Sequence, residues 1–559
     1  MRNPGSYFAN WRGVVSSACL GWLALLGFVA CDSSQPELHV NAAAATGQLE
    51  VRILDERGEP VPSMVEIARS DTGVLYSPEG FVDLRPLLHG KRTAGRFLKR
   101  VPGKLAGSYW CAPARGVREA LPPGFWRLTV LHGLEYVPRQ IEFEIREGET
   151  VAIEVGLERW IDAPSIGWWS ADDHVHARLT SDLDTQLLLT CAMGEDVHVV
   201  NVLAMGSYDK ILFEQRGFGR GFRVQGGNTV LVPGQEDPRT GHLGGNRGVH
   251  LGHALVLNLS RSMIRDPSRY YLYDWVFDAA RRQGASVGYA HVAGGQFHVA
   301  RDMSINVPKG RVDFGEILQF DKLDTRLYYE FLNLGLRLAA SAGSDFPWGG
   351  SIGEARVYAY VDPEKAFDVD QWFEAFSAGR TFVSNGLILD FRVDGLLPGA
   401  EIDAVEEQRL SVSARVSGHP AFDTPRALEV IRFGRVVETA SSTDPSATEL
   451  ALSFEVSAEH GFWIAARAFG WDGSAAHSGP IWVVREGLRP WDHRDVPGLL
   501  DIRLEQLSDL QVIHARLQGE DPHHPFVQQW EELKPRIDEA RALYERWRVV
   551  AQQESAYRR

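Results

Sequence analysis

Two histidines in the segment ADDHVHARLTSD, residues 171–182, are spaced for metal binding. His174 and His176 stand two residues apart among acidic neighbours, just after a segment rich in strand-forming residues. On an extended strand this spacing points both imidazoles to the same face, where they can bind one metal ion. Paired histidines also occur in strands as ordinary polar residues, so the interpretation depends on whether later segments supply further ligands.

Later segments supply histidines and acids in a definite order. A glycine-rich stretch carries Glu236 and His253, GYAHVAGG carries His291, and AASAGSDFPWGG carries Asp345. Imidazoles and carboxylates together suit Zn²⁺, Mn²⁺ or Fe²⁺. Taken alone, each histidine could instead pack at the entrance to a strand, and it is the ordered set that favours a metal site.

The apolar patterns divide the chain into four regions after its N-terminus. Residues 47–160 alternate apolar and polar positions between turns, which predicts a β-sandwich. Residues 165–395 alternate apolar strands with helical stretches, which predicts a barrel-like α/β core whose working residues lie at the carboxyl ends of strands. Residues 396–486 return to short strands, as in an immunoglobulin-like sandwich. Residues 487–559 repeat apolar residues at helical spacing and predict a helical tail packed on the body.

The ordered motifs resemble those of the PHP superfamily of metallohydrolases, and most closely its CehA/McbA group. The family motifs read roughly GDLHVHT, an acidic GEE followed by GH, then AHP, GSD and GRTFVTNG; the last is GRTFVSNG here, residues 379–386. The resemblance covers about residues 160–395. No single motif is specific, but the ordered set is.

This resemblance implies a distorted β/α barrel with a metal cluster at its mouth, flanked by the two β-sandwiches and the helical tail. The pair His174 and His176 is expected to bind a first metal ion together with Asp345. A second ion is expected on His253 and His291, with Glu236 bridging the two sites. Such a bridging acid holds two ions about 3.5–4 Å apart.

A third metal site, common in the superfamily, is not expected. Asp182 matches the acid of that site, but the segment VVNVLAM offers no suitable histidine, and Asp345 is followed by Phe-Pro where the family carries a further histidine. Because two of its three ligands are missing, we predict a two-metal centre. His198 or His298 could serve as a substitute ligand from a nearby loop.

The N-terminus predicts export. Arg2 and Arg12 precede an uncharged, mostly apolar run over residues 13–30, and Cys31 follows in FVAC, which resembles a bacterial lipobox. Residues 1–31 are therefore predicted to be a lipoprotein signal peptide. A lipidated Cys31 would hold the mature protein at the bacterial cell envelope, on its periplasmic or extracellular face. An uncleaved N-terminal anchor helix is the alternative.

Composition limits the partners and the kind of scaffold. The net charge of −15 argues against nucleic-acid binding and offers no basic surface for anionic lipids, so membrane attachment would be through the lipid. Apart from Cys19 and Cys31, only Cys111 and Cys191 occur in the 559 residues. The fold is therefore not expected to be built on a disulfide framework.

Together these observations predict an exported metal-dependent hydrolase. Two ions sharing Glu236 would activate a bridging water toward an ester-like bond in a phosphoester, carboxyl ester or carbamate. Asp182 or His298 would give the leaving group its proton. The substrate is expected to be a small or polymer-derived ester, and the sequence does not indicate an oligomeric state. The alternative is a non-catalytic metal- or carbohydrate-binding surface lipoprotein that keeps the PHP-like barrel.

Overall fold

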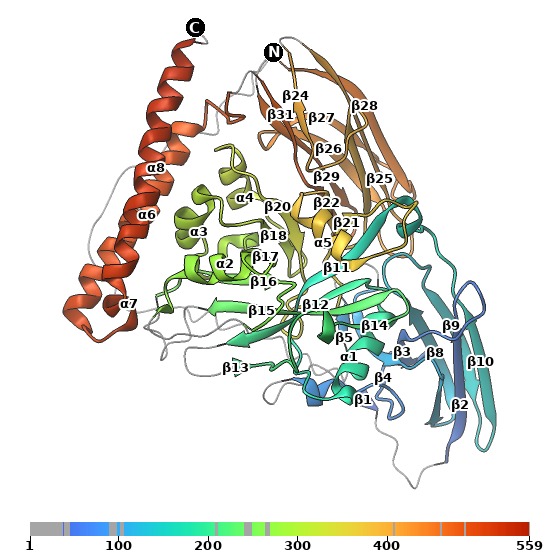
Figure 1. Ribbon diagram of the computed structural model, residues 1–559. Coiled ribbons are helices and arrows are strands. Elements are labelled where there is room, and N and C mark those ends of the chain that lie inside the picture. The colour runs from blue at the N-terminus through green and yellow to red at the C-terminus, as the bar shows by residue number, and fades with distance from the viewer. Residues whose placement is uncertain are drawn as a thin grey trace, which may run out of the picture.

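The computed structural model describes residues 37–38, 45–88, 98–100, 105–206, 211–239, 249–262, 269–405, 408–458, 461–485 and 488–557. They form a multidomain, mostly β protein in which two β-rich ends flank a central region that also contains helices (Figure 1). The predicted signal peptide, including Cys31, lies outside the described residues. No helix within the described ranges combines the length and the apolarity needed to cross a membrane.

The N-terminal region consists of a seven-stranded and a three-stranded sheet. Leu49, Val51 and Ile53 alternate along one strand of the smaller sheet and are buried in the apolar core together with Val65 and Leu128 of the larger one. This alternation is what the sequence pattern requires of a half-buried strand. The larger sheet contains β1 (Glu37–Leu38), β3 (Ser63–Arg69), β4 (Leu75–Tyr76), β5 (Leu98–Arg100), β6 (Gly107–Ala112), β8 (Gly124–Leu131) and β9 (Arg139–Ile145), and the smaller contains β2 (Gly47–Leu54), β7 (Val117–Leu121) and β10 (Thr150–Gly156).

The central region alternates strands with helices. Its first helix begins at a capping box, in which Ser181 and Asp184 each accept a hydrogen bond from the other's backbone N–H. The elements are β11 (Trp168–Val175), α1 (Asp182–Gly194), β12 (Val199–Gly206), β13 (Ile211–Leu212), β14 (Val224–Gly226), β15 (Thr229–Arg239), β16 (His253–Leu257), α2 (Tyr273–Arg281), β17 (Ser286–Tyr289), α3 (Ala300–Asn306), β18 (Phe314–Gln319), β19 (Lys322–Leu323), α4 (Arg326–Leu332), β20 (Ala339–Ala342), β21 (Arg356–Tyr360), α5 (Val369–Ser377) and β22 (Thr381–Ser384). Short 3₁₀ helices cover η1 (Arg85–Leu87), η2 (Pro164–Ile166), η3 (Arg220–Phe222), η5 (Ala293–His298) and η6 (Val307–Lys309).

The central strands form a curved sheet that does not close into a barrel. Strands β11, β12 and β15 are parallel neighbours, as are β17, β18 and β20, whereas β16 runs antiparallel to both β15 and β17. Strand β11 pairs with β12 on one edge and with antiparallel β21 on the other. Among the described residues, the backbone pairing between the segment after β20 and β11 is a single isolated bridge from Val175 to Phe346. A closed β/α barrel is therefore not confirmed, because β21 takes much of the edge that β20 would need.

The C-terminal β-rich region is hydrogen-bonded to the central sheet rather than separate from it. Strand β22 pairs with β21 on one side and with a C-terminal strand on the other, so one sheet runs across residue 396, the predicted domain boundary. A second, three-stranded sheet packs on it around buried Leu410, Val412 and Val416. The strands are β23 (Ile388–Val393), β24 (Glu401–Asp403), β25 (Arg409–Ser417), β26 (Pro425–Arg432), β27 (Arg435–Ser441), β28 (Glu449–Ser457), β29 (Phe462–Gly470), β30 (Ala475–Ser478) and β31 (Ile481–Val484).

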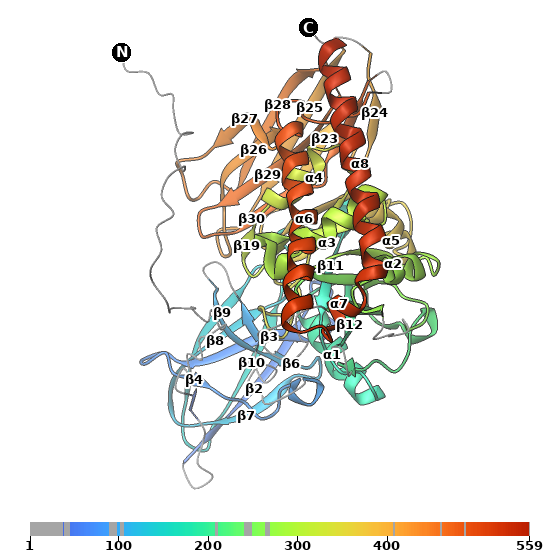
Figure 2. The same ribbon diagram turned by 90° about the vertical axis from the view of Figure 1, so that its left-hand side faces the viewer.

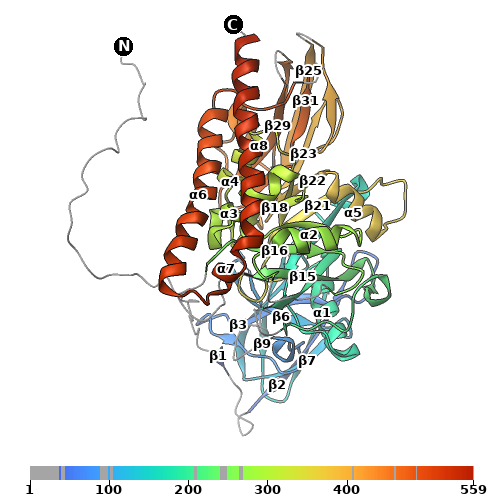
Figure 3. The ribbon, with the colours of Figure 1, turned by 60° about the vertical axis from the view of Figure 1, so that its left-hand side comes forward.

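The chain ends in a long helical hairpin formed by α6 (Val496–Glu520), α7 (Pro525–Gln528) and α8 (Trp530–Tyr557). Figures 2 and 3 show α6 and α8 lying side by side along the central region, next to α3. Leu500, Leu507, Ile537 and Tyr544 are buried in the same apolar cluster as the central strands. The apolar faces read from the sequence therefore pack on the body of the protein.

Candidate metal centre

The histidines and acids lie together at one end of the strands of the central sheet. Strand β11 ends beside His174 and His176, His291 follows the end of β17, and Asp345 follows the end of β20. Because β16 runs antiparallel to β15 and β17, its first residue, His253, lies at this same end of the sheet. Functional residues of α/β folds usually lie at the carboxyl ends of parallel strands, and the histidines and acids of this sheet lie at that end.

The first group of side chains lies around the end of β11. The Nε2 atoms of His174 and His176 are 3.0 Å apart. Oε2 of Glu236 lies 3.1 Å from Nε2 of His176 and 3.7 Å from Nε2 of His174. Oδ1 of Asp345 lies 3.4 and 3.6 Å from the Nε2 atoms of His174 and His176. Four ligand-type side chains from three distant segments therefore face one point.

The second group shares Glu236 with the first. Oε1 of Glu236 lies 2.7 Å from Nδ1 of His253, which in turn is 3.2 Å from Nε2 of His291. Within each of the two buried groups, His174–His176–Glu236 and Glu236–His253–His291, the ligand atoms lie within 4.8 Å of one another. These groups can hold a metal ion. The structure thus brings together the six residues that the sequence motifs selected.

Surrounding residues fix the orientation of the imidazoles. Nδ1 of His174 is 2.9 Å from a carboxylate oxygen of Glu316, and Nδ1 of His176 is 3.1 Å from the backbone carbonyl of Leu203. Nδ1 of His291 is 2.7 Å from Oε1 of Gln319. An oxygen acceptor at Nδ1 places the proton there and leaves the Nε2 lone pair facing the cluster. Metal-binding histidines are typically held by second partners of this kind.

The backbone around the ligands is also held by specific contacts. Asp172 accepts hydrogen bonds from the backbone N–H groups of His174, Ser344 and Gly353, which ties the end of β11 to the segment carrying Asp345. Asp345 has φ of 51° and His291 has φ of 59°. Residues other than glycine rarely adopt positive φ, and such strain is concentrated at functional sites.

The electrostatics of the cluster favour a cation. Burial lowers the pKa of His291, and the nearby His253 and His174 lower it further, well below its ordinary value. Burial alone would also lower the pKa of His174, but the carboxylates of Glu316 and Asp345 outweigh it and raise this pKa well above the ordinary value. Without a metal ion, the raised pKa means that His174 holds an extra proton beside these carboxylates. A divalent transition metal ion, which imidazole and carboxylate ligands suit, would displace that proton on binding.

Aromatic rings pack against the histidines of the cluster. Phe297 stacks on His253 with ring centroids 4.2 Å apart. Trp348 meets the ring of His176 edge-on at 5.3 Å and also packs on Phe213. Trp348 is 36% exposed, whereas the ligands are almost fully buried, so this indole lies between the cluster and the solvent.

The structure does not place Asp182 with the ligands. Asp182 is in the first turn of α1, its side chain is 93% exposed, and it forms an ion pair with Arg216. His298 is exposed as well, but it directly follows Phe297, which covers His253. The proton-donor roles predicted for Asp182 and His298 remain predictions, and of the two only His298 is adjacent to a residue that contacts a ligand.

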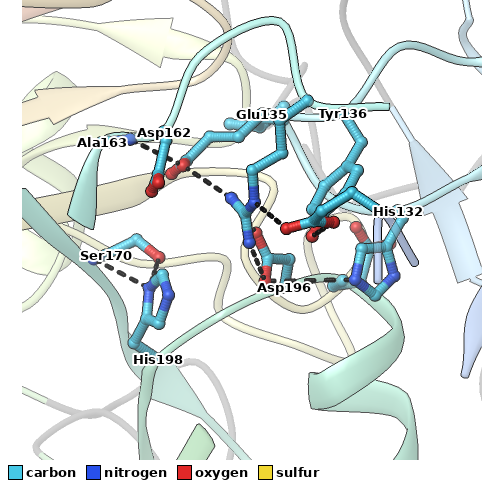
Figure 4. Close-up of polar contacts among 12 residues, drawn as sticks. His132, Glu135, Tyr136, Asp162, Ala163, Ser170, Asp196 and His198 are labelled. Atoms are coloured by element: carbon cyan, nitrogen blue, oxygen red, sulfur yellow. Dashed lines mark hydrogen bonds and ion pairs between the residues drawn. The ribbon is translucent and has the colours of Figure 1, made fainter. Parts of the chain in front are cut away.

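His198, the other suggested substitute ligand, lies at the opposite end of the sheet. It precedes β12, and its Nδ1 is 2.9 Å from Oγ of Ser170 near the start of β11 (Figure 4). Burial lowers the pKa of His198 to about 4, so the ring is neutral in the folded protein. Since the ligands gather at the carboxyl ends of these strands, His198 is not part of the cluster.

Sequence reasoning missed Glu316 and Gln319. Both lie on β18 and are fully buried, and both reach the imidazoles as described above. The signal was present in the segment FGEILQF, where an acid and an amide interrupt an otherwise apolar strand. A buried strand tolerates such residues only when they have polar partners.

Comparisons with known proteins give no identity. No family model and no curated protein match the chain. Among solved structures, a minor pilin of Streptococcus agalactiae is 12% identical, with 21% of this chain and 47% of the pilin covered and a TM-score of 0.15. The TIE protein of Bacillus anthracis is 7% identical over 79% of this chain and 50% of that protein, with a TM-score of 0.14. The chain spans about half the length of these structures, and TM-scores this low carry no argument. What the structure itself defines is a multidomain, mostly β protein with a buried His/Glu site able to hold a metal ion.

Proposed function

We propose that this protein is an exported hydrolase that uses two divalent metal ions, Zn²⁺, Mn²⁺ or Fe²⁺, to cleave an ester-like bond. The observation that carries the proposal is the sharing of Glu236. One of its oxygens faces His174 and His176, and the other faces His253. A carboxylate set between two groups of imidazoles is the arrangement that a two-metal site needs.

The residues of the chain have separable tasks in this proposal. Glu316 and the Leu203 carbonyl keep the Nε2 lone pairs of the histidine pair directed inward. Asp345 and Glu236 are buried and supply negative charge, which would offset the positive charge of bound cations. Bound divalent ions would act as Lewis acids toward the ester oxygen and toward water.

The proposed fold of the central region is a distorted, incompletely closed PHP-like β/α barrel. It is supported by the order of the candidate ligand segments along the chain and by their position at one end of the strands of the curved sheet. His298 is the candidate proton donor for the leaving group, because it lies on the exposed side of the segment that covers His253. Export and attachment through a lipidated Cys31 rest on the N-terminal sequence alone.

The test is elemental analysis of the purified protein combined with a substrate panel. The panel should contain phosphomonoester, phosphodiester, carboxyl ester and carbamate substrates, each with and without a chelator. We expect about two metal ions per chain and turnover of at least one substrate class that the chelator abolishes. Glu236→Ala should lose both ions, while Asp182→Asn, on the exposed start of α1, should keep them.

Two results would contradict the proposal in different ways. If the protein binds no metal at any pH above about 7, where ordinary imidazoles are neutral, the six residues do not form a metal site. A protein that binds two ions but turns over nothing in the panel would favour the non-catalytic metal-binding surface protein instead.

A further inference from the structure

Two cysteines from different parts of the chain meet at the junction between the N-terminal sheets and the central region. Cys111 lies on β6 of the larger N-terminal sheet, and Cys191 lies on α1. Both are free thiols that are 3% and 0% exposed, and both belong to the same apolar cluster. The metal centre described above uses neither of them.

The local structure turns both side chains into the same apolar cluster. Along β6, Tyr109 and Cys111 share the cluster that includes α1, whereas Ala112 points into the N-terminal core, as the alternation of a strand requires. On α1, Leu188 and Cys191 are three residues apart and therefore lie on one face, which is buried in the same cluster. Figure 2 shows α1 beside β3 and β6, and both strands contact the helix.

Independent contacts hold the helix close to this sheet. Met64 on β3 is the strand partner of Cys111. A methyl group built on Gly194, at the end of α1, would lie 3.6 Å from the sulfur of Met64 and 3.4 Å from the backbone N of Ser63. The helix thus approaches the strands to van der Waals distance, and Cys111 is close enough to Cys191 to raise the pKa of its thiol.

A buried ion network fixes the same junction a short distance away. Arg159 lies 3.1 Å from both Glu135 and Asp196, and His132 lies 4.0 Å from Asp196. Glu135 and His132 follow β8, whereas Asp196 follows α1, so these pairs join the two regions (Figure 4). These ion pairs hold β8 and the end of α1, and with them the two regions that carry Cys111 and Cys191, against each other.

We propose that Cys111 and Cys191 form a disulfide that covalently ties the N-terminal sheets to the central region. The bond forms by thiol–disulfide exchange with an external organic disulfide or a disulfide-bearing oxidoreductase. The two protein thiols lose two electrons and two protons, and the external disulfide takes them up to become two thiols. An oxidising compartment, which the proposed export provides, supplies such a reagent.

Burial determines when this exchange takes place. Burial and the neighbouring Cys111 raise the pKa of the Cys191 thiol well above its ordinary value, and the thiolate is the reactive form. The folded, reduced protein therefore reacts slowly, and pairing occurs while the two regions are docking. Once formed, the bond is shielded from reductants until the junction opens.

The experiment is peptide mapping of the full chain. The protein is synthesised in a cell-free reaction containing oxidised and reduced glutathione, then unfolded in urea with an alkylating agent and no reductant, and digested with trypsin. Cleavage after Lys and Arg places Cys111 in residues 105–115 and Cys191 in residues 179–210, while Cys19 and Cys31 share residues 13–52. We expect the first two peptides joined and unalkylated, and separated by a reductant. The Cys191→Ala variant should leave Cys111 alkylated.

Stability gives a second readout that does not depend on mapping. Oxidised protein should melt roughly 5 °C higher than protein of the same sequence synthesised under reducing conditions. The variant carrying both Cys111→Ala and Cys191→Ala should melt at one temperature under either condition. Alkylation of both cysteines after oxidising synthesis, or a glutathione adduct on one of them in place of the joined peptides, would overturn the proposal. This test measures neither metal content nor turnover, so its outcome is independent of the proposed hydrolase activity.

Discussion

The Nε2 atoms of His174 and His176 lie 3.0 Å apart although Nδ1 of each ring already faces an oxygen acceptor. In neutral rings the proton therefore sits on Nδ1, and the two Nε2 lone pairs point at one another. Two facing lone pairs repel, and the nearby Glu236 carboxylate adds negative charge to the same point. A cation removes this repulsion. Without a metal ion the cation is an extra proton on His174, whose pKa is raised well above its ordinary value, and a bound metal ion would take the place of that proton.

Metal removal should therefore lower the stability of the protein. A ligand present at a thousand times its dissociation constant stabilises the folded state by about 4 kcal/mol. We expect a chelator to lower the apparent Tm by several degrees and added Zn²⁺ or Mn²⁺ to restore it, as measured by scanning calorimetry. His253→Ala should show a smaller response to chelator. Asp182→Asn should respond like the wild type, and a wild-type Tm indifferent to chelator and metal would contradict the prediction.

Sequence reasoning predicted which side chains lie together better than it predicted the scaffold. The six ligand candidates could be selected because each imidazole or acid stands in a short motif whose order along the chain carries information. Closure of the barrel could not be read in this way, because it depends on which strand takes the free edge of β11, and strand pairing is set by contacts distant in sequence. The same limit hid the continuous sheet through β22.

The two residues that were missed, and the exposed position of Asp182, have local physical explanations. Glu316 and Gln319 contact the Nδ1 atoms of His174 and His291, a supporting position that no ligand motif marks. Asp182 was matched to a family acid by position. Here the capping box of Ser181 and Asp184 starts α1 at that point and turns Asp182 into solvent.

Glu316 should control metal affinity without binding the metal. It accepts from Nδ1 of His174 and from the backbone N–H of His291, so it orients one ligand in each group. Glu316→Gln keeps the shape but removes the charge, and we expect a 10- to 100-fold loss of affinity. Competition with a fluorescent chelator measures this. Glu374→Gln, on the exposed side of α5, is the matched control, and equal affinity in both variants would refute the role of Glu316.

Arg159 should be essential to the junction between the N-terminal sheets and the central region. It pairs with Glu135 and Asp196, and burial together with Asp196 raises the pKa of Glu135 to about 8. Arg159→Met leaves the buried Glu135 and the largely buried Asp196 without this cation, and breaking a buried ion pair typically costs about 3–5 kcal/mol.

We therefore expect a large drop in the apparent Tm of Arg159→Met, greater at high pH, where both acids must ionise. Adding Asp196→Asn should recover part of the loss. Arg52→Met removes an exposed ion pair with Glu154 and should change stability by less than about 0.5 kcal/mol. If the two arginine variants melt alike, the buried network does not stabilise the junction.

His477 should contribute to the loss of stability in acid. It lies on β30, where Nε2 accepts from the hydroxyl of Tyr329 and Nδ1–H donates to the carbonyl of Ser478. Burial lowers its pKa to about 3, against an ordinary value near 6.5. Between these values the unfolded chain binds a proton that the folded chain does not, so stability is complete above pH 6.5 and falls as the pH decreases, by up to about 1.4 kcal/mol per pH unit.

Replacing His477 should make the acid response shallower even though it weakens the fold at neutral pH. His477→Gln keeps an acceptor for Tyr329 but cannot be protonated. Between pH 6.5 and 4.5 its unfolding free energy should fall by about 2 kcal/mol less than that of the wild type. The comparison uses urea unfolding with chelator present throughout, so that acid release of metal does not enter, and exposed His523→Gln serves as control. Parallel pH curves for the wild type and His477→Gln would mean that His477 is protonated as readily in the folded protein as in the unfolded chain.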